Sequence, residues 1–105
     1  MAIDFEKVKC IAIDYAENVR QAFSVNKVIL FGSIANGSAN ESSDVDICFF
    51  LDDFKGKNRV DIIGELLKHC RIYKGAFFEP IAFQTSEIEC GNPFVKEILS
   101  TGIEI

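Results

Sequence analysis

The stretch VILFGSIANGSANESSDVDICFF, residues 28–50, carries the pattern that decides the fold of this chain. Two apolar runs flank a polar loop that contains glycine, and both runs have the composition of strands. At the start of the second run, Asp44 and Asp46 occupy alternate positions. Because side chains alternate between the faces of a strand, both carboxylates point the same way, whereas Val45 and Ile47 face the opposite, buried side.

The spacing of the two aspartates suits a bound cation. Two acids on one strand face lie about 7 Å apart and can reach the same cation or cation pair. Like charges at that separation destabilise each other unless a positive charge lies between them, and Mg²⁺ combines one or two protein carboxylates with water and phosphate oxygens. The alternative is that Asp44 only begins the strand and that Asp46 lies on a solvated face.

The end of the first apolar run adds a candidate phosphate site. Gly32 and Ser33 follow that run directly and precede a short helical candidate over residues 33–36. Backbone N–H groups and a hydroxyl would therefore be offered at a helix N-terminus, where phosphate is favoured. Taken alone, the same residues also fit an ordinary turn that ends a strand. Gly37 permits a left-handed turn and close approach of the backbone.

Length and composition indicate one globular domain over residues 1–105. Apolar residues make up 49% of the chain and charged residues 26%, which is a foldable composition. Eleven Lys and Arg against 16 Asp and Glu give a net charge of -5, so the overall field repels polyphosphate and argues against duplex nucleic acid as a partner.

The cysteines and the N-terminus bear on the cellular compartment. The four cysteines are widely separated, and one histidine leaves little material for a zinc site, so we expect reduced, mostly buried thiols. The N-terminal residues resemble no signal peptide, and no apolar run is long enough to span a membrane. We therefore expect a cytoplasmic protein.

Helical and extended patterns alternate along the chain. The predicted elements are a helix over 4–23 with Asp4 as its N-cap, strands over 27–31, 44–51 and 76–83, helices over 33–36 and 58–70, and a last helix over 94–100 that Asn92 and Pro93 begin and Gly102 follows. Pro80 indicates an edge position or an irregular end for the third strand. The order α-β-α-β-α-β-α predicts an α/β or α+β domain with a small sheet covered by helices.

These residues carry a resemblance to a known family. Gly32-Ser33, ten intervening residues and then Asp44-Val45-Asp46-Ile47, set between two strands, resemble the signature of the nucleotidyltransferase superfamily related to DNA polymerase beta. The length and the ending FEPIAFQTSEIECGNPFVKEILSTGIEI are similar to the minimal nucleotidyltransferases, the small partners of helical HEPN-domain proteins. The resemblance covers nearly the whole chain and implies the nucleotidyltransferase fold, with a small mixed sheet flanked by helices.

The resemblance implies a site and a reaction. A nucleoside monophosphate would pass from a triphosphate, usually ATP, to a hydroxyl acceptor with the help of two Mg²⁺ ions. Gly32 and Ser33 would hold the triphosphate, with Gly37 and Ser43 as further nucleotide-binding candidates, and Asp44 and Asp46 would bind the metals.

The family commonly adds a third carboxylate from a neighbouring strand. Glu79 is the only charge inside the apolar run AFFEPIAF, and a carboxylate in such a run needs a partner, a metal or access to solvent. We therefore predict Glu79 as the third catalytic and metal-binding carboxylate. The alternative is an exposed strand end beside Pro80. The rival acids fall in a loop or a helix and fit less well; they are Asp52, Asp53, Asp61 and Glu65.

One departure from the family pattern concerns positive charge. Many members carry arginines in this loop, as in G-S-R-A-R-G, where this chain has Ile34 and Asn36. Lys55, Lys57 and Arg59 after the second strand could supply charge from elsewhere, although such a cluster is more often a solvated turn.

Three functions follow as expectations. The first is Mg²⁺-dependent transfer of AMP from ATP to a hydroxyl, a tyrosine of a partner HEPN protein, with this chain acting as the antitoxin. The second is a non-catalytic module of the same fold that neutralises its partner by forming a complex. The third is a nucleotide-sensing domain acting alone. A homo-oligomer is compatible with each, because the Phe-rich strands leave apolar surface for an interface.

Overall fold

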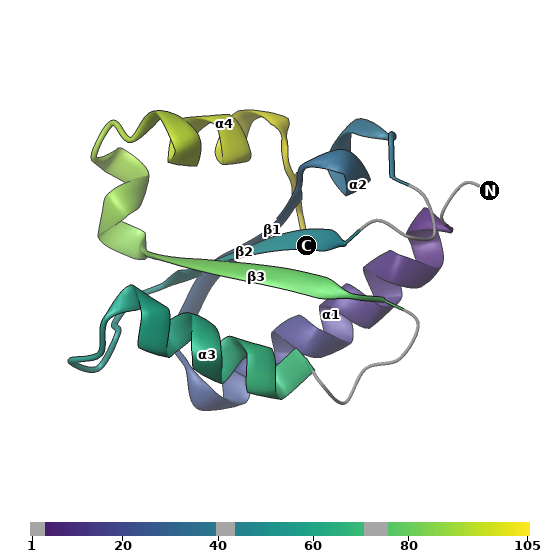
Figure 1. Cartoon of the computed structure of the whole chain (residues 1–105). Coiled ribbons are helices and arrows are strands. Elements are labelled where there is room, and N and C mark those ends of the chain that lie inside the picture. Colours follow the sequence, from purple (N-terminus) through teal and green to yellow (C-terminus); the bar gives the residue numbers. More distant parts are fainter. Residues whose placement is uncertain (1–3, 40–43, 71–75) are drawn as a thin grey trace.

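A computed structural model describes residues 4–39, 44–70 and 76–105 of the chain, in which helices cover both faces of one sheet (Figure 1). In chain order the elements are α1 (Phe5–Ala22), β1 (Val25–Phe31), α2 (Ser33–Asn36), β2 (Val45–Leu51), α3 (Arg59–Cys70), β3 (Phe78–Gln84), the 3₁₀ helix η1 (Thr85–Glu89), α4 (Pro93–Thr101) and β4 (Ile103–Glu104).

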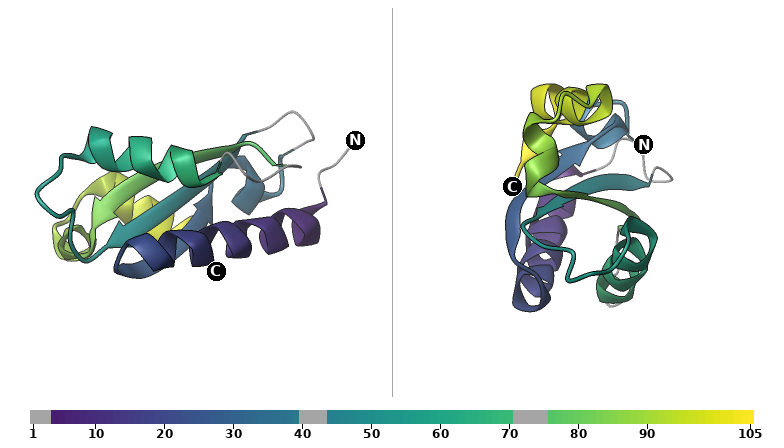
Figure 2. Two further views of the ribbon diagram at one scale, coloured as in Figure 1. Left: turned by 90° about the horizontal axis from the view of Figure 1, so that it is seen from below. Right: turned by 90° about the vertical axis from the view of Figure 1, so that its left-hand side faces the viewer.

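The sheet is mixed and has the strand order β3-β2-β1-β4. β1 is antiparallel to both β2 and β4, whereas β2 and β3 run parallel and are joined through α3. Figure 2 shows α1 and α3 together on one face of the sheet and α4 on the other. The fold class predicted from the sequence, α/β with a small mixed sheet flanked by helices, is therefore confirmed.

The local signals in the sequence act as predicted. The Asp4 side chain accepts a hydrogen bond from the backbone N–H of Lys7 and caps α1, and Asn92 caps α4 in the same way, followed by Pro93. β3 is an edge strand, the position that Pro80 predicted. The sequence reading missed η1 and β4, because a 3₁₀ turn and a two-residue strand lack the periodicity on which it relied.

Both faces of the sheet are packed against apolar side chains. One cluster joins the inner sides of α1 and α3 to alternate strand residues such as Leu30, Phe49 and Ala82. The second cluster, around Phe50 and Phe83, lies under α4. β2 is consequently buried on both faces, and Asp46 is the one residue of this strand that retains partial exposure.

The structure corrects the expectation for the cysteines. All four are free thiols, but Cys48 alone is buried, whereas Cys10 and Cys90 are exposed and Cys70 is half-buried. Burial in β2 raises the pKa of the Cys48 thiol to about 12, with a smaller contribution from the charge of Glu87. In the described parts of the chain, none of the helices has the length and apolar character to cross a membrane.

Gly102 allows α4 to turn directly into β4, and we predict that it tolerates no larger side chain. A Cβ atom there would overlap the Ile29 side chain and lie 2.9 Å from the Leu30 carbonyl oxygen. Gly102→Ala should therefore lower the free energy of unfolding by about 1–3 kcal/mol.

Gly64→Ala in α3 is the matched control, because a Cβ atom at Gly64 meets nothing within 4 Å. Replacing a helical glycine by alanine should raise the free energy of unfolding by about 0.5–1 kcal/mol. Urea denaturation of both variants measures the difference, and equal effects of the two substitutions would contradict the assigned contact.

Candidate active site

Three strand ends meet at one end of the sheet and bring three of the predicted site residues together, Gly32, Asp46 and Glu79. Asp46 lies opposite Phe31 in the antiparallel pairing of β1 with β2, and opposite Glu79 in the parallel pairing of β2 with β3. Gly32 follows Phe31 at the end of β1. The carboxylates of the central and edge strands therefore lie beside the turn that leads into α2.

Asp46 lies directly over the backbone of Gly32. A Cβ atom built at Gly32 would overlap Asp46 Oδ2, so the absence of a side chain is what admits the carboxylate. The backbone of Gly32, with φ 71° and ψ -144°, also lies in a region that residues with a Cβ rarely adopt. The glycine of the Gly32-Ser33 pair is thus required twice, once by its conformation and once by its contact with Asp46.

The turn after Gly32 forms a single short helical segment. The Gly32 carbonyl accepts hydrogen bonds from the N–H groups of Ala35 and Asn36, both at 3.1 Å. Gly32 has no side chain to cap the first N–H groups of α2, and Gly37 ends the helix in the left-handed conformation, as predicted. Ser43, predicted to contact the nucleotide, lies outside the described residues.

Asp46 and Glu79 form a close pair of acids. Burial, a side-chain hydrogen bond with Glu79, the charge of Glu79 and the charge of Asp44 together raise the pKa of Asp46 to about 6. Below about pH 6, Asp46 keeps a proton that it shares with Glu79 through their hydrogen bond, and this proton relieves the repulsion between the two carboxylates of the metal-free protein. Glu79 is exposed, which leaves it free to approach a ligand.

A divalent cation fits this pair on chemical grounds, because it would replace the shared proton and neutralise the same charge. Asp44 precedes β2, is exposed, and acts on Asp46 only through its charge. Among the described residues, no three His, Cys, Asp or Glu side chains already converge tightly enough to hold a metal ion. Asp44 would therefore have to turn towards the Asp46–Glu79 pair to complete a set of three ligands.

Rival acid Asp52 has a structural role elsewhere. It lies beyond the far end of β2 and accepts hydrogen bonds from the hydroxyls of Ser24 at 2.8 Å and Thr85 at 2.7 Å. These bonds lower the pKa of Asp52. It holds the chain ends of β1 and β3 together and is not part of the candidate site.

The structure decides between the two interpretations of Lys55, Lys57 and Arg59, a source of charge for the site or a basic turn away from it, in favour of the second. Lys55, Lys57 and Arg59 follow β2, whereas Asp46 lies near its beginning, about 17 Å away along the strand. Lys57 pairs with Glu65 at 2.9 Å, and Arg59 pairs with Glu87 at 2.7 Å. Lys55 donates to the carbonyl of Ala22, so all three cations have partners at the opposite end of the sheet.

Ile34 and Asn36, which stand where arginine is common in the pattern G-S-R-A-R-G, have other roles in this chain. Ile34 is 3% exposed and belongs to the core cluster on the α1 and α3 face of the sheet, so this side chain is turned away from the site. The Asn36 side chain is exposed, and its amide oxygen accepts hydrogen bonds from Ser38. In this chain, the loop therefore supplies backbone N–H groups and neutral side chains.

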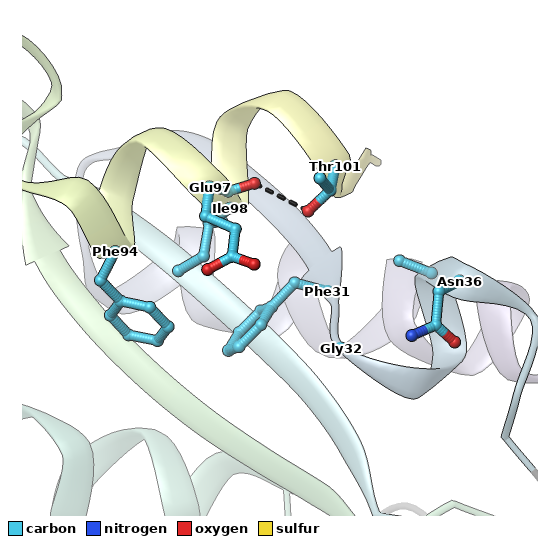
Figure 3. A pocket seen from close by; sticks show the side chains of 8 residues that line it. Phe31, Gly32, Asn36, Phe94, Glu97, Ile98 and Thr101 are labelled. Carbon is cyan, nitrogen blue, oxygen red and sulfur yellow. Dashed lines mark hydrogen bonds between the residues drawn. The ribbon is translucent and has the colours of Figure 1, made fainter.

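A pocket of about 390 Å³ adjoins the Gly32 turn, between α2 and α4 (Figure 3). Its lining includes Phe31, Gly32 and Asn36 from the turn region, and Phe94, Glu97 and Thr101 from α4. The sequence reading did not assign these α4 residues to the site. Their spacing, Phe94, Glu97 and Thr101, places them on one face of a helix, which was the available signal.

The sequence and the fold of this chain are similar to those of known proteins. Residues 13–100 match the model of the nucleotidyltransferase domain. The crystal structure of a protein described as a "putative nucleotidyltransferase" from Sulfolobus solfataricus superimposes with a TM-score of 0.64 at 20% identity, over 95% of this chain and 80% of that chain. A search of curated proteins found no significant match.

We predict that Gly32→Ala damages the site beyond its effect on stability. The added methyl group must displace the Asp46 carboxylate, and the positive φ adds about 1–3 kcal/mol of strain. Mn²⁺ or Mg²⁺ binding, measured by calorimetry on the folded protein, should weaken about tenfold or more.

Gly56→Ala is the matched control for this substitution. Gly56 has φ 77°, but a Cβ atom there meets nothing within 4 Å, so strain is introduced without touching the site. Unchanged metal affinity in Gly56→Ala, beside weakened affinity in Gly32→Ala, assigns the loss to Asp46. Equal losses in both variants would refute that assignment.

We predict that metal binding depends on pH through Asp46. Between about pH 4 and 6, the folded metal-free protein retains a proton on Asp46 that the unfolded chain has lost, so this group lowers stability as the pH rises. A metal ion competes with that proton. The increase in Tm on adding Mg²⁺ should therefore be small at pH 5 and larger at pH 7.5.

Glu79→Gln tests the cause of this pH dependence. The variant removes the charge of Glu79, while the burial of Asp46 remains, so the pKa of Asp46, followed by NMR titration of the metal-free protein, should fall from about 6. A Tm increase that is equal at pH 5 and pH 7.5 in the unmodified protein would contradict the proposed competition.

Proposed function

This chain belongs to the nucleotidyltransferase domain family, and from that membership we propose that it transfers AMP from ATP to a hydroxyl group in an Mg²⁺-dependent reaction. The observation that carries the proposal is the position of Asp46, which lies over the Gly32 turn and pairs with Glu79 across β2 and β3. A phosphate-binding turn and a pair of metal-binding carboxylates are the two halves that nucleotidyl transfer requires.

Each site residue has a role in this proposal. Gly32 and Ser33 bind the triphosphate through the uncapped N–H groups at the start of α2 and the Ser33 hydroxyl, and Gly37 and Ser43 support the same loop. Asp46 and Glu79, joined by Asp44, hold the Mg²⁺ ions. Bound Mg²⁺ neutralises charge on the triphosphate and lowers the pKa of the attacking hydroxyl.

The proposed reaction exchanges one phosphorus–oxygen bond for another. The acceptor oxygen forms a bond to the α-phosphorus of ATP, the bond to the bridging oxygen breaks, and pyrophosphate leaves with that oxygen. The acceptor loses its hydroxyl proton, which the carboxylates at the strand ends are placed to receive. Positioning and charge neutralisation carry most of the catalysis of such a step.

The acceptor in this proposal is a tyrosine of a helical HEPN-domain partner, which this chain silences as an antitoxin. Phe77 supports a partner surface beside the site, because it lies two residues before Glu79 and is 76% exposed. An exposed phenylalanine next to the candidate carboxylates suits an apolar contact with a docking protein.

A second function is favoured by one observation, the missing positive charge. Ile34 is buried and Asn36 is neutral, while Lys55, Lys57 and Arg59 have partners at the far end of the sheet. A site with few cations fits a non-catalytic module that neutralises its partner by forming a complex. The intact arrangement of Asp46, Glu79 and Gly32 favours the enzyme.

We predict that label from α-³²P-ATP is transferred to the HEPN partner in the presence of Mg²⁺. Asp46→Asn should reduce this transfer about a hundredfold or more, because an amide binds Mg²⁺ poorly. Asp61→Asn, an exposed position on α3, is the matched control and should retain transfer.

Partner binding, measured separately by calorimetry, distinguishes the two functions. Loss of label in Asp46→Asn with unchanged partner affinity supports the enzyme. Tight binding without label transfer by the unmodified protein would favour the non-catalytic module.

A further inference from the structure

The pocket beside the Gly32 turn is lined by side chains of α4 that have no role in the proposed transfer reaction. It is bounded by the end of β1, by α2 and by α4, and Gly32 forms part of its wall. A triphosphate held at Gly32 and Ser33 would therefore have the rest of its nucleotide within reach of this pocket. A volume of about 390 Å³ is at the lower end of the range for small-ligand pockets and suits a flat heterocyclic ring.

Two aromatic rings form the apolar part of the pocket. Phe31 and Phe94 contact each other edge to face, with ring centroids 6.0 Å apart and an interplanar angle of 80°. Phe94 also contacts Phe83 at 6.1 Å, which fixes its ring, yet it remains 43% exposed. A fixed, partly exposed ring offers a face on which a flat heterocycle can stack.

Two polar side chains at the edge of the pocket, Glu97 and Asn36, can orient a bound ring. Figure 3 shows the Glu97 carboxylate pointing into the space between α4 and Phe31. Among the described residues, this carboxylate has no hydrogen-bond or ion-pair partner. The hydroxyls of Thr101 and Ser100 donate to the backbone carbonyl of Glu97, at 2.7 and 3.2 Å, and not to its carboxylate. A carboxylate accepts hydrogen bonds and repels other acceptors.

Asn36 supplies the complementary donor. Its Oδ1 accepts hydrogen bonds from the N–H of Ser38 at 3.0 Å and from the Ser38 hydroxyl at 2.6 Å. These bonds fix the orientation of the amide, and its NH₂ group is turned to the side of the pocket (Figure 3). The pocket thus presents one acceptor and one donor at its polar edge.

We infer that this pocket binds the base of the nucleotide and that Glu97 and Asn36 select adenine. The inference rests on the proposed function, because the triphosphate places the base next to Gly32. The exocyclic amine of adenine donates to the Glu97 carboxylate, and an adjacent ring nitrogen accepts from the Asn36 amide. The ring stacks on Phe94.

The same two groups discriminate against guanine. Guanine presents a carbonyl oxygen where adenine carries its amine, and Glu97 would repel that oxygen. Cytosine has the amine and the ring acceptor, but its single ring covers less of the Phe31 and Phe94 surface. The expected order of affinity is ATP, then CTP, then GTP and UTP.

The test compares base-dependent and base-independent binding to the full chain. Calorimetry with Mg²⁺ gives the affinities of ATP, GTP and inorganic tripolyphosphate, and NMR titration with adenosine reports contact with the Phe94 ring directly. Glu97→Gln should reduce the preference for ATP over GTP about tenfold, because its amide can donate to the guanine oxygen. Phe94→Ala should weaken ATP binding about tenfold.

Both variants should leave tripolyphosphate binding unchanged. Glu89→Gln, an exposed position on η1 away from the pocket, is the matched control and should change none of the affinities. Glu97→Gln is the decisive variant if Phe94→Ala loses stability, since an exposed Glu97 is replaced by a side chain of the same shape.

The outcomes separate this inference from the proposed function. Adenosine binding at Phe94 without tripolyphosphate binding would retain the pocket and overturn nucleotidyl transfer. Equal affinity for ATP and GTP, with tripolyphosphate still bound, would overturn the inference and leave the transfer reaction standing. Unchanged ATP selectivity in Glu97→Gln together with lost transfer to the acceptor would also overturn it, because the pocket would then serve the acceptor.

Discussion

The contact between the Asp46 carboxylate and the Gly32 backbone determines how the site is built. It joins the end of β1 to the start of β2 at the only residue of β2 that is not fully buried. Everything else on that strand packs into one of two apolar clusters, so the strand cannot slide by one residue without moving its aspartate to the other face. A closely packed central strand thus fixes the position of a charged group.

Asp46 and the Gly32 turn could be predicted from the sequence because the rules that apply to them involve only neighbouring residues. Alternation in a strand placed Asp44 and Asp46 on one face, and the glycine before the short helix indicated a turn with unusual backbone angles. Glu79 was a weaker prediction, since a single charge in an apolar run does not reveal its partner. Its place opposite Asp46 follows from the register of two parallel strands that are joined through α3.

The features that the sequence did not reveal depend on packing between distant segments. The pocket exists because α4 crosses the end of β1, and a helical pattern over Phe94 and Glu97 does not show which strand it will cover. The choice between the two interpretations of Lys55, Lys57 and Arg59 also depended on the fold, because closeness to Asp46 along the chain did not reveal that the length of β2 separates them. The exposure of Cys10 and Cys90 was missed because the expectation of buried thiols came from residue type alone, whereas Cys10 lies on the outer side of α1 and Cys90 lies in the turn after η1.

The topology of the sheet also bears on when the site forms during folding. Glu79 reaches Asp46 only after β3 has paired in parallel with β2, a contact that closes a loop through α3, and such non-local pairings form slowly. The wall that α4 adds to the pocket comes later still in the chain. A folding intermediate with only β1 and β2 paired would contain the Gly32 turn and Asp46 but lack the second carboxylate and the pocket. A ligand that contacts all of these parts would therefore bind the completed fold alone and would protect it from partial unfolding.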